Sequence, residues 1–94
     1  MNIPGFIHHI SYEKRYSEHT IKAYQNDLYV FAEYLKNYYN TFDLTQSGFE
    51  MVRSWIVHLM DQGMSPRSVN RKISSLKSYY KFLLKEGAIK SNPL

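Results

Sequence analysis

Apolar residues recur every three or four positions along most of this chain, and no segment alternates apolar and polar residues over the length of a strand. Such spacing gathers apolar side chains on one face of an α-helix. The 94 residues suffice for one domain and are too few for two separate cores. Only four glycines and three prolines occur, which argues against a turn-rich β protein. The sequence therefore predicts an all-α fold, a compact four-helix bundle with short connections.

The ends of the predicted helices follow from capping residues. Ser17 and Ser65 are candidate N-caps, and Pro66 suits a first helical position. Gly63 and Gly87 are suited to the left-handed conformation that often follows a helix. The predicted helices cover residues 3–10, 17–39, 47–63 and 65–86, joined between the second and third by a loop in which Phe42 and Leu44 point inward. The predicted core stripes are Ile3, Phe6, Ile7 and Ile10; Ile21, Tyr24, Leu28, Phe31, Leu35 and Tyr38; Phe49, Val52, Trp55, Ile56, Leu59 and Met60; and Val69, Ile73, Leu76, Tyr80, Leu83 and Leu84.

The net charge of +4 is distributed unevenly along the chain. Residues 1–64 carry five Lys or Arg and seven Asp or Glu, a net charge of −2. Residues 65–94 carry seven Lys or Arg and one acid, Glu86, a net charge of +6. A positive patch on a nearly neutral body suggests a docking surface for a polyanion, although a solvated lysine face has the same composition.

The predicted helix at 65–86 concentrates this charge on the face opposite its core stripe. That face carries Arg67, Asn70, Arg71, Ser74, Lys77, Ser78, Lys81 and Lys85. A solvated helix usually alternates charge signs, because like charges one turn apart repel by a few tenths of a kcal/mol. The phosphates of DNA would neutralise a single-sign face, and the major groove admits a helix. This pattern favours a nucleic-acid interface.

A smaller candidate surface lies near the start of the predicted helix at 17–39. His19, Lys22, Ala23 and Asn26 lie opposite its core stripe, with Thr20 at the edge. The helix N-terminus also presents backbone N–H groups that suit a phosphate. For Ser17 and Thr20, simple capping of the helix is the competing interpretation.

Other kinds of site find little support in the sequence. The four histidines are scattered and none is paired at i,i+4, so we expect no metal site. The absence of cysteine excludes disulfides and thiolate zinc sites. We expect no cofactor. Phe82 falls beside the basic face and is the one large apolar residue out of place, which suggests contact with another domain or subunit.

Two segments resemble a known family. YSEHTIKAYQNDLYVFAEYL (16–35) and GMSPRSVNRKISSLKSYYKFLLKEGAIKSNPL (63–94), in this order, are similar to the N-terminal core-binding domain of tyrosine recombinases, which include phage integrases and Xer-type recombinases. The resemblance covers nearly the whole chain and looks most Xer-like. It implies a SAM-like bundle in which helices similar to the second and fourth cross the major groove. By motif, His19, Thr20, Lys22, Ala23, Arg67 and Arg71 match groove-facing positions.

The resemblance also implies a division of labour. Residues 1–87 would form the core-binding domain, and residues 88–94 would begin a linker to a C-terminal catalytic domain absent from this chain. That domain holds the family's tyrosine nucleophile and its Arg, Lys and His/Trp partners, so we expect this fragment not to be an enzyme. The expected partners are double-stranded DNA, the catalytic domain of the same parent chain and other recombinase subunits.

A second hypothesis remains open from the residues alone. The basic face could meet an acidic protein, which would make the chain a helical protein-interaction module. No apolar run approaches the roughly 18 residues of a membrane span, and no secretory signal is visible, so we expect a cytoplasmic protein with no membrane partner.

Overall fold

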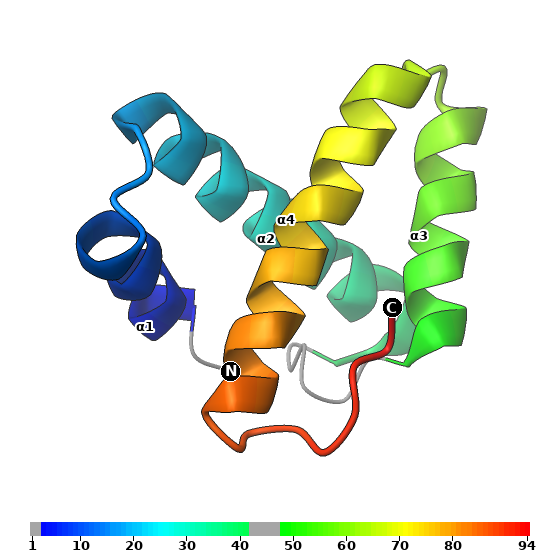
Figure 1. Cartoon of the computed structure of the whole chain (residues 1–94). Coiled ribbons are helices and arrows are strands. Elements are labelled where there is room, and N and C mark those ends of the chain that lie inside the picture. Colours follow the sequence, from blue (N-terminus) through cyan, green and yellow to red (C-terminus); the bar gives the residue numbers. More distant parts are fainter. Residues whose placement is uncertain (1–2, 42–47) are drawn as a thin grey trace.

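Helices make up most of residues 3–41 and 48–94, the part of the chain that this computed structural model describes. The elements in chain order are α1 (Ile3–His8), the π-helical turn η1 (His9–Glu13), α2 (Glu18–Tyr39), α3 (Phe49–Asp61) and α4 (Pro66–Lys85). These described ranges contain no strand, and the all-α prediction is confirmed. In Figure 1, α4 crosses α2 and has α3 on one flank and α1 on the other.

The first helix continues past its predicted stripe as the wider turn η1. The backbone N–H of Lys14 donates to the carbonyl of His9 at 3.1 Å, a bond that spans five residues. Arg15 then adopts a left-handed conformation with φ of 54°, which reverses the chain. The N–H of Tyr16 donates back to the carbonyl of Ile10 at 2.9 Å. Because of this turn, Lys14 and Tyr16 lie on the side of η1 that faces α4.

The predicted N-caps are confirmed at α2 and α4. The Ser17 hydroxyl accepts the N–H of Thr20 at 3.2 Å, and the Ser65 hydroxyl accepts the N–H of Ser68 at the same distance. Pro66 occupies the first turn of α4. Each cap stabilises its helix by about 1 kcal/mol, because it satisfies a backbone donor that has no partner within the helix.

The end of α4 is closed by a glycine motif. Gly87 has φ of 78°, and the N–H of Ala88 donates to the carbonyl of Leu83 at 2.9 Å. This is the bond that closes a Schellman motif. Lys85 is the last helical residue and Glu86 is the cap, one position before the predicted end. The tail then returns to the bundle, where Ile89 packs against the core.

The core is aromatic and is built around α4. Its largest fully buried side chains are Trp55, Tyr79, Tyr80, Phe6 and Phe31. Phe6 of α1 meets Tyr79 of α4 edge to face, with ring centroids 5.3 Å apart. On the other side, Phe31 of α2 lies 4.8 Å from Trp55 of α3. Aromatic pairs of this kind stabilise a core by roughly 0.5–1.5 kcal/mol beyond the burial of their area.

Two assignments on α4 were wrong. Phe82 is only 8% exposed and packs against Phe6 and His9, so it belongs to the core and is not an outlier on the surface. Leu84, predicted as core, is 42% exposed. Both errors have one cause: the α1–η1 segment covers the Phe82 flank of α4, whereas the Leu84 flank has no such cover. Periodicity orders side chains around a helix but cannot say how wide an arc the neighbours cover.

Other residues of the predicted core stripes are exposed where the stripe extends beyond the helix that packs against it. They are Tyr38 at the end of α2, Phe49 at the start of α3 and Met60 near the end of α3. The third helix begins at Phe49 with Gly48 as its cap. The predicted start at Ser47 and the inward placement of Phe42 and Leu44 lie outside the described residues.

Candidate nucleic-acid interface

The polar face of α4 is open to solvent along its whole length. The exposed residues among those predicted are Arg67, Asn70, Arg71, Ser74, Lys77, Lys81 and Lys85, and Ser78 is half-buried. Their accessibility follows from a helix period near 100° per residue, which sets them opposite the buried arc. The described carboxylates form no ion pair with Arg67, Lys77 or Lys81. This part of the face therefore carries uncompensated positive charge.

The predicted residues of α2 are also accessible. His19, Lys22 and Asn26 are exposed, whereas Thr20 and Ala23 are half-buried. The Ser17 hydroxyl donates to the Thr20 hydroxyl oxygen at 2.9 Å while it caps the helix. Thr20 thus takes part in the cap and keeps its own hydroxyl hydrogen available to an acceptor.

Asp27 joins α2 to α4 through a buried polar cluster that the sequence pattern did not predict. One carboxylate oxygen of this fully buried side chain accepts Nη2 of Arg71 at 2.8 Å and Nζ of Lys72 at 2.7 Å. The other oxygen accepts the Ser75 hydroxyl at 2.7 Å. We call these four residues the Asp27 cluster. Three donors and two opposite charges compensate a carboxylate that would otherwise be costly to bury.

The Asp27 cluster positions the two predicted surfaces relative to each other. It ties the middle of α2 to the first half of α4, and Asn26 and Arg71 lie at this crossing. Arg67 lies one turn before Arg71, about 5–6 Å along the axis. His19 lies about 12 Å along α2 from Asp27, since each residue adds 1.5 Å. The structure thus brings Arg71 to the Asn26 end of the α2 surface, and His19 and Lys22 lie further along α2.

Arg71 therefore contributes to the fold and is also accessible to a ligand. Its side chain is 50% exposed, and one of its N–H groups binds Asp27. A guanidinium has five N–H donors, so donors remain for a second acceptor in solvent. The bond to Asp27 also holds the guanidinium in one place, which lowers the entropy lost when it binds a ligand.

The sequence contains a signal for this cluster that periodicity by itself overlooks. Asp27 stands three residues after Tyr24 and four before Phe31, within the apolar stripe of α2. Lys72 likewise stands three residues after Val69 and four before Leu76, within the apolar stripe of α4. An acid on one stripe and a cation on another predict a buried pair only if the two positions meet, and helical spacing does not contain that information.

Within residues 3–41 and 48–94, no group of three or more His, Asp or Glu side chains could hold a metal ion. No helix of the same ranges combines the length and apolarity that a membrane span requires.

The chain matches the model of one protein family over most of its length. Residues 3–87 match the phage integrase N-terminal SAM-like domain. No solved structure was found to match.

Curated relatives are named as recombinases. The chain is 38% identical to the tyrosine recombinase XerC of Oceanobacillus iheyensis over 91 residues, which cover 97% of this chain and 30% of the relative. It is 42% identical to XerC of Listeria innocua over 88 residues, 94% of this chain and 29% of the relative. It is 37% identical to the tyrosine recombinase XerD of Rickettsia conorii over 93 residues, 98% of this chain and 29% of the relative. The chain thus spans about 30% of the length of the relatives it matches.

Proposed function

This chain belongs to the family of phage integrase N-terminal SAM-like domains, and from that membership we propose that it is the DNA-binding module of a site-specific tyrosine recombinase. The single observation that carries the proposal is the cationic face of α4, which the fold leaves exposed and, apart from Arg71, largely without counter-charge. A duplex supplies phosphates along this face and base edges within its major groove.

In this proposal α2 and α4 enter the major groove over half of a recombination core site. His19, Thr20, Lys22, Ala23 and Asn26 form the α2 contact surface. The α4 contact surface consists of Arg67, Asn70, Arg71, Ser74, Lys77, Ser78, Lys81 and Lys85. Arg67 and Arg71 are placed for base edges or phosphates, and the lysines further along α4 for phosphates. The neutral Asn and Ser side chains between the cations add donors without repulsion.

The module would position a catalytic domain without acting as an enzyme itself. The relatives are more than three times the length of the matched region, which leaves room for a separate domain that cuts and rejoins DNA. We propose residues 1–87 as the core-binding domain and residues 88–94 as the start of the linker. The partners would be double-stranded DNA, that catalytic domain and other recombinase subunits, and a role on chromosomal or mobile-element DNA places the protein in the cytoplasm.

Fluorescence anisotropy with a labelled duplex tests the proposal. Binding should weaken as salt rises, with a log–log slope of about −0.9 for each phosphate neutralised. Arg67→Glu should weaken binding strongly, because it reverses an exposed charge that has no ion pair. Arg53→Glu is the matched control, since Arg53 is an exposed arginine on α3, outside both proposed surfaces. Equal effects of the two reversals would refute the α4 interface.

The alternative is a helical module whose basic face meets an acidic protein. Failure of the wild-type chain to bind any duplex at low salt would favour this alternative. Incubation with supercoiled plasmid tests the non-enzymatic role separately, because the proposal expects the plasmid to stay uncut and unrelaxed.

A further inference from the structure

A pocket of about 170 Å³ opens between the α1–η1 segment and the second half of α4. Its floor is apolar and aromatic, formed by Phe6, Ile10, Phe82 and the ring of His9. Its polar lining comes from two elements that are far apart in the sequence: Lys14 and Tyr16 after η1, and Ser78, Lys81 and Lys85 on α4. The volume is well above the roughly 10–15 Å³ that a cavity needs to hold one water molecule.

The polar lining contains donors and cations but no carboxylate. Three lysines line one small pocket, and like charges at its lining repel each other unless an anion lies between them. Glu13 is bonded to His9, is exposed and is not part of the lining, although its charge interacts with that of Lys85. The pocket therefore has the composition of an anion site. Its apolar floor would keep water from one side of a bound anion.

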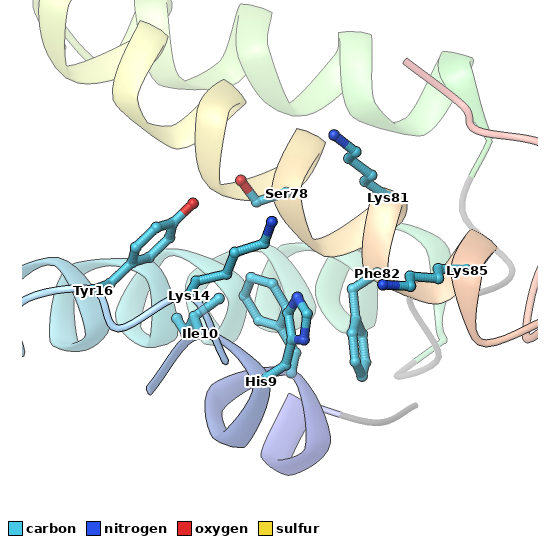
Figure 2. A pocket seen from close by; sticks show the side chains of 9 residues that line it. His9, Ile10, Lys14, Tyr16, Ser78, Lys81, Phe82 and Lys85 are labelled. Carbon is cyan, nitrogen blue, oxygen red and sulfur yellow. The ribbon is translucent and has the colours of Figure 1, made fainter. Parts of the chain in front are cut away.

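The donors are grouped within the pocket. Figure 2 shows the Lys14 ammonium, the Tyr16 hydroxyl and the Ser78 hydroxyl gathered at one end. Lys85 reaches in from the other end beside His9, and the Lys81 ammonium turns away from both. The tight turn after η1 positions Lys14 and Tyr16. The backbone hydrogen bonds from their amides lie on either side of Arg15, which has a left-handed conformation. A tyrosine has two side-chain torsions and a fixed ring, so little entropy is lost when its hydroxyl binds.

We propose that the end of this pocket formed by Lys14, Tyr16 and Ser78 binds one phosphodiester of the DNA backbone. The proposal rests on the proposed function and extends it beyond α2 and α4 to the turn after η1. The pocket is continuous with the α4 contact surface through Ser78, Lys81 and Lys85, so a duplex lying on that surface passes over it. An ammonium and two hydroxyls match the acceptor oxygens of one phosphate.

Two variants separate the charge at this site from its hydrogen bonds. In anisotropy titrations with a labelled duplex, Lys14→Ala should reduce the magnitude of the salt slope by about 0.9 and weaken all duplexes alike. Tyr16→Phe should weaken binding roughly two- to tenfold without changing the salt slope, because it removes a hydrogen bond and no charge. Lys14→Arg should retain the wild-type slope. Lys36→Ala, which removes an exposed lysine of α2 outside the pocket, is the matched control.

The outcomes distinguish this inference from the proposed function. If Arg67→Glu weakens DNA binding but Lys14→Ala behaves like Lys36→Ala, the phosphate site is refuted and the DNA-binding module stands. If the wild-type chain binds no duplex, both fail.

The pocket could instead bind free inorganic phosphate. A titration with inorganic phosphate, monitored through the amide NMR signals, tests this possibility. We expect the signals of Lys14, Tyr16 and Ser78 to shift when duplex binds and to shift back when salt releases it. Saturation of these signals by inorganic phosphate with no competition from duplex would refute a backbone site. Thermal unfolding followed by circular dichroism confirms that each variant is folded.

Discussion

Both halves of α4 carry lysine or arginine residues, but the halves differ in whether a carboxylate of the protein lies beside these cations. In the first half, Arg71 and Lys72 converge on Asp27, a carboxylate that the protein itself supplies and buries completely. In the second half, Lys81 and Lys85 line an open pocket whose lining contains no carboxylate. In the first half, two cations share one carboxylate supplied by the fold, whereas the pocket of the second half is lined by no carboxylate.

This difference shows that the cations of a basic helix must be separated into those that bind groups of the protein itself and those that remain available to a ligand. Lys72 is only 6% exposed and serves the joint between α2 and α4. Arg71 shares that role and still reaches solvent. Arg67, Lys77, Lys81 and Lys85 are exposed, and this set is available for an external anion.

The largest expected effect is at Asp27. Asp27→Asn keeps the size of the side chain but leaves Lys72 buried beside a neutral amide. The loss of one partner of a buried ion pair typically costs about 3–5 kcal/mol. Urea unfolding should show this loss. Since Asp27→Asn by itself could abolish folding, the double variant Asp27→Asn/Lys72→Met provides the second measurement, and it should regain part of the stability because no buried charge remains.

An unchanged free energy of unfolding in Asp27→Asn would contradict the view that Asp27 compensates the buried charge of Lys72.

The next effect separates the two cations within the Asp27 cluster. A double-mutant cycle of Asp27→Asn with Lys72→Met should give a larger coupling energy than the cycle with Arg71→Met. The Lys72 side chain is 8% exposed and the Arg71 side chain 50%, and water screens the more exposed pair. Coupling of about 1–3 kcal/mol is expected for Lys72, and about 1 kcal/mol or less for Arg71. Equal couplings from urea unfolding would show that both cations are structural.

A smaller effect is expected in the second half of α4. Lys81→Ala should change the free energy of unfolding by no more than about 0.5 kcal/mol, because the side chain is exposed and has no ion pair. The same variant should lower the affinity for duplex DNA. A stability loss comparable to that of Lys72→Met would remove the distinction between the two halves.

The smallest effect concerns the rim of the pocket. The hydrogen bond from the His9 ring, with its charge, lowers the pKa of Glu13 below its ordinary value of 4.5. A carboxyl whose pKa is lower in the folded state stabilises the fold above its unfolded pKa, and this stabilisation is lost as the pH falls through the folded value. His9→Ala should therefore reduce the drop in urea midpoint below pH 4.5. An identical drop in wild type and His9→Ala would show that the pair does not contribute.

Much of the local structure could be predicted from single segments. The serine caps at Ser17 and Ser65, the first-turn Pro66 and the glycine after α4 depend on residues close in sequence, so a short window contains the necessary information. The exposed face of α4 was predicted for the same reason, because a fixed helical period orders its side chains.

The errors arose where a second element decides the outcome. Phe82 lies on the flank of α4 that α1 and η1 cover, and Leu84 on a flank left exposed. Tyr79 lies outside the predicted core stripe of α4 but is completely buried. A single helix gives each residue an angle, but burial depends on the width of the arc that its neighbours cover.

The sequence by itself determined that the chain is helical, where most of its helices begin and end, and that one helix presents an exposed cationic face, since all three depend on interactions within a few turns. Only the tertiary structure decided that Asp27 neutralises part of this charge and that Lys14 meets Ser78 across a pocket. The members of each group are tens of residues apart in the chain. Their meeting depends on the angles and offsets at which the helices pack, and those are set by the whole core together.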